Sequence, residues 1–298
     1  MFKGVYTAIV TPFREDGSFD EEGMRRLIGF QIENKIDGIV PCGTTGESPT
    51  LSHEEHDLVI DAAVKHVNGR VPVIAGAGSN STAEAIRLTK HAAEAGADAV
   101  LQVNPYYNKP TQKGLYLHFK AIADAVEIPV IVYNIKGRTA VNVETPTLVK
   151  LMNDCKNIIG VKEASGDINQ MKDVIASRKA GFSVLSGDDN MTLELIKAGG
   201  DGVISVASNI VPDRITAMVH AALDGRMREA EKMNNEMDEL FRACFYETNP
   251  IPIKTALAMQ GKCKEIFRLP MCTMEENNKE KLRQVLEDLK ILEHLEAA

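Results

Sequence analysis

Lys162 ends an apolar run, Ile158–Lys162, whose composition is typical of a buried β-strand. Burial at a strand end favours the neutral form of a lysine amine, because removing water penalises the charged form. A neutral amine can attack a carbonyl carbon to form an imine, so Lys162 is a candidate Schiff-base nucleophile. The alternative is a structural lysine whose ammonium reaches solvent or pairs with Glu163.

A second candidate group, Gly43-Thr44-Thr45-Gly46-Glu47-Ser48, follows another apolar run. The two glycines permit tight backbone conformations in which N–H groups converge on an anion such as a carboxylate. The hydroxyls of Thr44 and Thr45 can donate hydrogen bonds or carry protons. Loops of glycine and threonine are also common as simple turns, so the pattern alone leaves both interpretations open.

Two further strand ends carry phenols and a guanidinium. Tyr133 can act as an acid or base, and Arg138 can hold a carboxylate through two hydrogen bonds. A tyrosine that caps a core and an arginine on a solvated loop are the structural alternatives. Tyr106 and Tyr107 are adjacent in a loop that contains two prolines. We expect one of these rings to point toward its own chain and the other toward a neighbouring chain.

His53 and His56 lie one turn apart on a predicted helix, which the pattern Ser52-x-x-Glu55 predicts to begin with a capping box. Histidines at this spacing can share a metal ion, but the sequence places no third ligand near them. A solvated helix face is the usual setting for such a pair. We therefore predict no metal site and no cofactor.

These groups follow short apolar runs that alternate with amphipathic segments such as Thr82–Ala95 and Gly114–Ala125. Runs without polar alternation indicate strands buried on both faces, as in a parallel sheet. Eight strand–helix units over about 220 residues predict an α/β fold of the (β/α)8 TIM barrel type, whose site lies at the C-terminal strand ends. An open doubly wound sheet is the alternative, although no glycine-rich nucleotide turn follows the first run. The runs are Gly4–Val10, Gly38–Cys42, Val71–Ala75, Ala97–Val103, Ile128–Tyr133, Ile158–Lys162, Phe182–Ser186 and Gly202–Val206.

After Ser208 the apolar positions recur at helical spacing, including an amphipathic stretch at Glu280–Leu295. We predict helices from about Pro212 onward. We assign residues 1–225 to the catalytic barrel and residues 226–298 to a C-terminal helical extension.

The composition limits the partners of the chain. Its 298 residues include 34 Lys and Arg against 42 Asp and Glu, a formal charge of −8. A net acidic protein is a poor match for nucleic acid or an anionic membrane, and no run approaches the roughly 20 apolar residues of a membrane span. The five cysteines are scattered without a Cys-x-x-Cys pair, which fits a reducing compartment. We expect a cytoplasmic protein that acts on small molecules.

Together, the strand ends resemble those of a known family. The segments Gly43-Thr44-Thr45-Gly46-Glu47, Tyr133-Asn134-x-x-x-Arg138 and Val161-Lys162-Glu163-Ala164 are similar to motifs of the pyruvate-dependent aldolases typified by dihydrodipicolinate synthase and N-acetylneuraminate lyase. The resemblance extends from Gly4 to about Lys254. It is strongest to the dihydrodipicolinate synthase branch, because sialic-acid lyases tend to have Ser-Thr in the loop and lack the arginine.

The resemblance implies a lyase reaction of lysine and diaminopimelate biosynthesis. Lys162 would form an imine with pyruvate, whose carboxylate rests on the amides of Thr44 and Thr45. The derived enamine would attack L-aspartate 4-semialdehyde, whose carboxylate Arg138 holds. Cyclisation would then release Lys162 and yield 4-hydroxy-tetrahydrodipicolinate.

The resemblance also implies a shared site. Tyr107 would reach across a tight-dimer interface and complete a hydroxyl relay with Tyr133 and Thr45, and two such dimers would form a homotetramer. Gly187 and Ile204 would line the pyruvate pocket.

In lysine-sensitive members of the family, L-lysine inhibits from a site at the same interface. The Glu84 carboxylate suits an ammonium, and Tyr106 adjoins the relay residue, so the resemblance predicts feedback inhibition here. A surface acid on a helix is the alternative interpretation of Glu84. The matching residues are Ser48, Pro49, His53, His56, Asn80, Glu84 and Tyr106.

One departure from the family pattern and two alternative functions remain. Lys136 stands where the family usually has proline. The lysine leaves the backbone before Arg138 less restricted than proline would, and it adds a cation that we expect to point outward. The chain can also be a sibling Schiff-base aldolase acting on a 2-keto-3-deoxy sugar acid or N-acetylneuraminate. A metabolite-binding barrel without catalysis is the other alternative, and borohydride trapping with pyruvate excludes or supports it.

Overall fold

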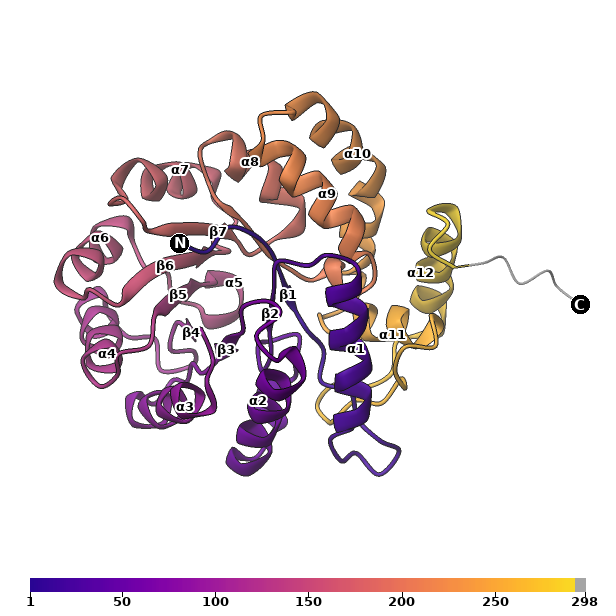
Figure 1. Ribbon diagram of the computed structural model, residues 1–298, viewed down its shortest axis with the longest axis horizontal. Helices are drawn as coiled ribbons and strands as arrows, with labels where there is room; N and C mark the ends of the chain where they lie inside the picture. The colour runs from indigo at the N-terminus through magenta and orange to yellow at the C-terminus, as the bar shows by residue number, and fades with distance from the viewer. Residues whose placement is uncertain (293–298) are drawn as a thin grey trace, which may run out of the picture.

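The computed structural model describes residues 1–292, and its centre is a barrel of eight parallel strands (Figure 1). The hydrogen-bonded order is β2-β1-β8-β7-β6-β5-β4-β3, and a bridge between Ile39 and Val73 joins its two ends. The predicted TIM barrel is therefore confirmed. The strands are β1 (Gly4–Ala8), β2 (Gly38–Val40), β3 (Ile74–Gly76), β4 (Ala99–Val103), β5 (Val130–Asn134), β6 (Ile158–Glu163), β7 (Ser183–Ser186) and β8 (Gly202–Ser205).

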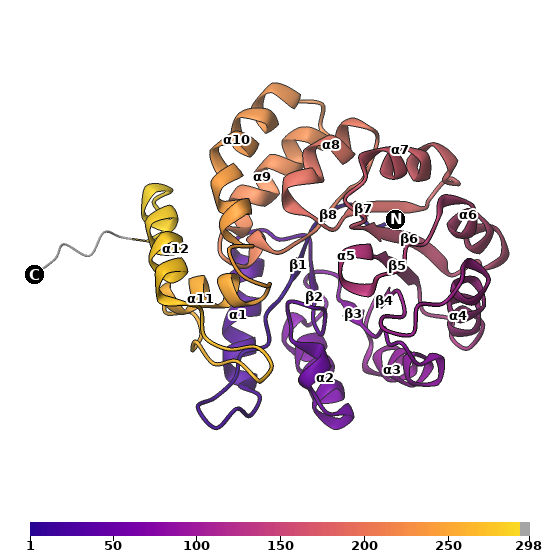
Figure 2. The same ribbon diagram turned by 180° about the vertical axis from the view of Figure 1, so that it is seen from behind.

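A helix follows each strand, and together these helices form a ring around the barrel in both views (Figures 1 and 2). A short helix, α5 (Lys136–Thr139), is inserted between β5 and the fifth helix of the ring, α6 (Thr145–Asp154). Single 3₁₀ turns follow β2, β7 and β8 at Ser48–Thr50, Asp189–Met191 and Ala207–Asn209. The ring consists of α1 (Glu21–Glu33), α2 (His53–Val67), α3 (Thr82–Ala95), α4 (Gln112–Asp124), α6 (Thr145–Asp154), α7 (Ile168–Ser177), α8 (Thr192–Lys197) and α9 (Pro212–Leu223).

Three more helices follow the ring: α10 (Met227–Ala243), α11 (Ile251–Met259) and α12 (Glu276–Asp288). α10 packs against α9, and α12 packs against α10 and α11 on the outside of the molecule (Figures 1 and 2). Because α9 packs against β1 and β8, the helical region expected from about Pro212 begins with a helix of the barrel itself. The predicted end of the last helix, Leu295, lies outside the described residues.

Local sequence signals explain several helix boundaries. The predicted capping box at Ser52 and Glu55 is present, with the Ser52 side chain accepting from the Glu55 N–H and the Glu55 carboxylate accepting from the Ser52 N–H. The predicted helix Thr82–Ala95 has the same bounds in the structure, and Gly96 ends it in the left-handed conformation. Over residues 1–292, none of the helices combines the length and apolar character that a membrane crossing requires.

Alternate residues of each strand face the interior of the barrel, where they form a core separate from the larger one between strands and helices. Tyr6, Ile131 and Leu185 belong to the interior core, whereas Val132 and Val161 belong to the outer one. Lys162 follows Val161 and pairs in register with Tyr133, so its side chain has the inward parity.

The first and last strands pack so closely that the barrel needs a glycine where they meet. Gly202 has φ +144°, and a Cβ added there would lie 1.9 Å from the carbonyl oxygen of Gly4. Because this neighbour is backbone in a paired strand, it has little freedom to move.

We expect Gly202→Ala to lower the free energy of unfolding by about 1–3 kcal/mol or more, since the new methyl group overlaps the β1 backbone. Gly29→Ala is the matched control, because a Cβ at that position of α1 meets nothing within 4 Å. The control should gain about 0.5–1 kcal/mol from its helix propensity. Urea unfolding followed by circular dichroism measures both, and equal stabilities for the two variants would contradict this account of barrel closure.

Candidate active site

A cavity opens at the C-terminal ends of the strands, and six of the predicted residues line it. They come from the turn after β2, from β5 and β6, and from the segments that follow β5 and β7. These six residues are Thr44, Thr45, Tyr133, Arg138, Lys162 and Gly187.

The Lys162 side chain is 5% exposed and points into this cavity from β6. Its Nζ atom lies 4.2 Å from the centroid of the Tyr133 ring on the neighbouring strand. A Cβ added to Gly187 would lie 3.0 Å from Lys162 Cε and 2.5 Å from Ala164 Cβ. The glycine therefore leaves the space that the lysine stem occupies.

Internal hydrogen bonds hold the Gly43–Glu47 turn after β2. The N–H of Gly46 donates to the Gly43 carbonyl and the N–H of Glu47 to the Thr44 carbonyl, both at 3.1 Å. Thr11 Oγ1 donates to the Gly46 carbonyl at 2.6 Å. Glu47 has φ +53°, a left-handed conformation that residues other than glycine rarely adopt. The turn is thus a fixed structure rather than a loose loop.

Two predicted side chains of the cavity are bound to one residue that the sequence analysis missed. Asn249, in the segment before α11, donates from Nδ2 to Thr45 Oγ1 at 3.1 Å. Its carbonyl accepts from Arg138 Nη2 at 3.1 Å. Nothing in the local sequence indicates this role, because Asn249 reaches the cavity through the fold of the C-terminal extension.

Lys136 is exposed on the first turn of α5.

The sequence analysis also missed Asp188, which lines the cavity directly after Gly187. Burial raises the pKa of the Asp188 carboxyl group, and the nearby Lys162 opposes this effect. The rule that functional groups follow barrel strands would have found Asp188, since β7 ends at Ser186.

Two of the predicted residues do not line this cavity. Ile204 is fully buried in the interior core, and Val206 lies in the cavity wall in its place. Tyr107 is 90% exposed, in a left-handed conformation with φ +72°, and so faces away from the cavity of its own chain.

A second cavity of about 380 Å³ adjoins the first one, and six residues of the predicted lysine site line it: Ser48, Pro49, His53, His56, Glu84 and Tyr106. Asn80 is not in its wall but donates from Nδ2 to the Tyr106 carbonyl at 3.2 Å. Thr44 and Arg138 line both cavities, so the two sites share part of their walls.

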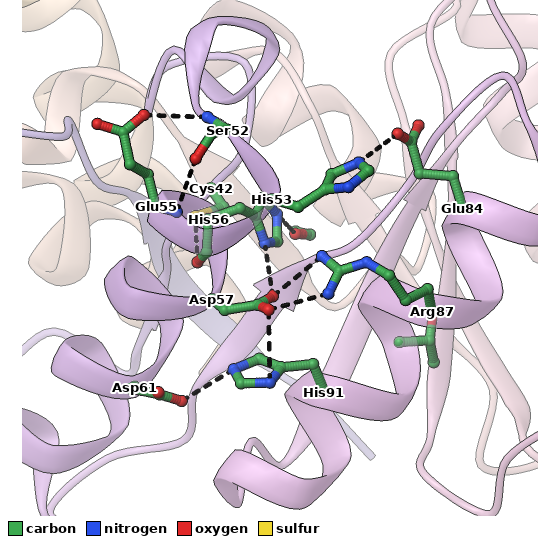
Figure 3. Close-up of polar contacts among 12 residues, drawn as sticks. Cys42, Ser52, His53, Glu55, His56, Asp57, Asp61, Glu84, Arg87 and His91 are labelled. Atoms are coloured by element: carbon green, nitrogen blue, oxygen red, sulfur yellow. Dashed lines mark hydrogen bonds and ion pairs between the residues drawn. The ribbon is translucent and has the colours of Figure 1, made fainter.

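His53 of α2 and Glu84 of α3 both line the second cavity, and their side chains point toward one another (Figure 3). His53 Nε2 lies 2.6 Å from a Glu84 carboxylate oxygen. A hydrogen bond from the Ser79 hydroxyl, followed by the one from His53, lowers the pKa of the Glu84 carboxyl group. Glu84 is therefore held as a carboxylate that a cationic ligand can approach. Within residues 1–292, no three side chains of His, Cys, Asp or Glu are placed to hold a metal ion.

His56 is largely buried in the wall of this cavity. Its Nε2 donates to the Gly76 carbonyl at 2.9 Å, while Nδ1 has no hydrogen-bond partner and lies 4.0 Å from Asp57 Oδ1. Burial lowers the pKa of the imidazole, and Asp57 opposes this effect while Arg87 adds to it. Asp57 is itself bound by Arg87, whose two terminal nitrogens donate at 2.9 and 3.1 Å (Figure 3).

Residues 1–289 match the Dihydrodipicolinate synthetase family. The chain belongs to this family. A relative from Syntrophus aciditrophicus (strain SB), named 4-hydroxy-tetrahydrodipicolinate synthase, is 57% identical over 97% of this chain and 98% of its own length.

Solved structures of dihydrodipicolinate synthases have the same fold. The chloride-inhibited enzyme from Acinetobacter baumannii, complexed with pyruvate, has a TM-score of 0.96 at 44% identity, covering 98% of this chain and all of that one. The enzyme from Cyanidioschyzon merolae, with lysine bound, has a TM-score of 0.95 at 41% identity, covering 98% of this chain and 99% of that one.

For this member of the dihydrodipicolinate synthetase family, we expect His56 to make folding pH-dependent. The unfolded histidine binds a proton near its usual pKa of 6.5, whereas the folded one binds it only at lower pH. The contribution of His56 to the free energy of unfolding is therefore fully present above pH 6.5. It falls as the pH decreases toward the folded pKa, by at most about 1.4 kcal/mol per pH unit.

His56→Gln isolates this contribution, because its amide can keep the bond to Gly76 but does not titrate. Between pH 7 and pH 5, the wild type should lose more urea-unfolding free energy than the His56→Gln variant does. A constant difference over that range would contradict the assignment.

Proposed function

We propose that the protein condenses pyruvate with L-aspartate 4-semialdehyde to 4-hydroxy-tetrahydrodipicolinate, as a Schiff-base lyase of lysine and diaminopimelate biosynthesis in the cytoplasm. The observation that carries the proposal is the buried Lys162, in a cavity whose wall also holds a guanidinium, Arg138. The relative from Syntrophus aciditrophicus, named for this reaction, supports it across 97% of the chain.

The first half-reaction joins pyruvate to the enzyme. The Lys162 amine nitrogen attacks the C2 carbonyl of pyruvate, and loss of water leaves an imine. The N–H groups of Thr44 and Thr45 bind the pyruvate carboxylate. Removal of a proton from the methyl group gives an enamine, whose terminal carbon is the nucleophile of the next step.

The second half-reaction forms one carbon–carbon and one carbon–nitrogen bond. The enamine carbon attacks the aldehyde carbon, whose oxygen takes up a proton and becomes the product hydroxyl, while Arg138 holds the carboxylate of the semialdehyde. The amino group of the semialdehyde then displaces Lys162 from the imine carbon and closes the ring. The balance is one water lost from the two substrates.

Protons move through the hydroxyls of Tyr133, Thr45 and Tyr107. Because Asn249 donates to Thr45 Oγ1, the Thr45 proton is free to be donated to another acceptor. The exposure of Tyr107 supports its insertion into the site of a partner subunit in a tight dimer. Two such dimers form the proposed homotetramer. Gly187 shapes the pyruvate pocket from its wall, and Ile204 does so from the barrel-interior core.

Borohydride reduction in the presence of pyruvate should attach a reduced pyruvate adduct to the peptide that contains Lys162. Lys162→Arg keeps the charge but cannot form the imine, so turnover should fall by several orders of magnitude while the fold remains. Peptide mass mapping and a coupled assay with both substrates measure these outcomes. A label on Lys136 or Lys254, or no label at all, would overturn the assignment.

The second cavity supports inhibition by L-lysine. Glu84 presents a carboxylate to an ammonium group, and Tyr106 and Ser48 offer polar contacts in the same wall. The related enzyme from Cyanidioschyzon merolae has lysine bound. Because Thr44 and Arg138 belong to both cavities, a ligand in the second one can shift groups that bind both substrates.

We expect lysine to inhibit turnover with a coupling of about 1–3 kcal/mol. Glu84→Ala and His56→Lys should weaken inhibition, because the first removes the carboxylate and the second adds a cation. Pyruvate trapping on Lys162 should survive in both variants, which serves as the control. Calorimetry without lysine binding, together with unchanged activity at millimolar lysine, would exclude this regulation and leave the catalytic proposal standing.

A further inference from the structure

A fully buried ion pair connects the C-terminal extension to the Gly43–Glu47 turn. Lys254 Nζ, from α11, lies 2.6 Å from Glu47 Oε1, and the two side chains are 0% and 1% exposed. The residues are 207 positions apart in the chain. Lys254 is therefore a buried amine that the proposed reaction does not use.

The surroundings fix both partners. The Lys254 ammonium lies 4.2 Å from the centroid of the Phe13 ring and 5.2 Å from that of Phe267. The second oxygen of Glu47 accepts from the backbone N–H of Arg268 at 3.2 Å. Both carboxylate oxygens of Glu47 thus have partners on the C-terminal extension, and its position is determined by that extension.

The pair bears on the turn because of where Glu47 lies. Its N–H closes the hydrogen bond to the Thr44 carbonyl, and its backbone is in the left-handed region. A residue other than glycine keeps this conformation only when its surroundings enforce it. Burying two charges adds little net stability on average, whereas removing one partner alone leaves an unpaired buried charge.

We propose that Glu47 and Lys254 are positioning residues for pyruvate: the ion pair holds the Gly43–Glu47 turn so that the Thr44 and Thr45 amides meet the pyruvate carboxylate. This inference rests on the proposed function. It also explains why a second buried lysine near the site is not a nucleophile: its amine is already bonded to Glu47.

The test compares Lys254→Met and Glu47→Asp with Lys279→Met. Methionine removes the charge at nearly constant length, and aspartate keeps the charge but draws the carboxylate back from Lys254 and Arg268. Lys279→Met is the control, because Lys279 forms a 2.6 Å ion pair with Glu265 within the same extension rather than with a residue of the turn. Each variant is assayed as the full-length protein for kcat, for KM of each substrate, and for the rate of borohydride trapping with pyruvate.

We expect the KM for pyruvate to rise about tenfold or more in Lys254→Met and Glu47→Asp, with slower trapping, because a small displacement of binding groups is costly. The KM for aspartate semialdehyde should change little, and the control should match the wild type. Folding is checked by circular dichroism and by mass in solution.

Three results would overturn the proposal: folded variants with wild-type pyruvate KM, an equal rise in both KM values, or failure of both Lys254→Met and Glu47→Asp to fold. The last result would assign the pair to stability alone. A wild-type protein that forms no pyruvate imine would instead disprove the proposed function itself, which keeps the two failures distinguishable.

Discussion

Three separate features place the Lys162 side chain in the mouth of the barrel. Strand register gives it the inward parity, the Tyr133 ring lies beside its amine, and Gly187 has no Cβ to meet its stem. A shift of one residue in β6 would turn the lysine into the apolar layer under the helices. The proposed roles of the Gly43–Glu47 turn and of Arg138 depend on the position of this amine.

The two cavities share a wall, so the proposed regulation would need no large movement to reach the proposed catalytic site. Thr44 and Arg138 each contribute to both cavities. Packed protein interiors transmit small displacements because they have few voids. A ligand beside Glu84 would thus share wall residues with the groups proposed to hold the substrates.

Much of this architecture could be predicted from the sequence. Strands buried on both faces show as unbroken apolar runs, and helix Thr82–Ala95 was predicted to the residue because serine and glycine mark its two ends. Lys162, Tyr133, Thr45 and Arg138 could be found because each follows or ends such a run.

The contacts that could not be predicted cross long distances in the chain. Asn249 and Lys254 approach the turn after β2 only because α11 folds back over the barrel mouth, and no local pattern carries that information. β3 begins three residues later than the apolar run that predicted it, since Val73 makes only an isolated bridge. Tyr107 is uninformative within one chain, because its proposed partner groups belong to another.

The pairing of β1 with β8 has a consequence for the order in which the molecule is made. The first strand to leave the ribosome has no barrel to close until Gly202–Ser205 has been synthesised. At that stage the turn after β2 still lacks the contacts that Glu47 makes with Lys254 and Arg268. Contacts of this sequence separation form late and slowly. A nascent chain that stops after the barrel therefore carries the proposed nucleophile without the contacts that fix its neighbours, and the complete candidate site forms only in the last part of translation.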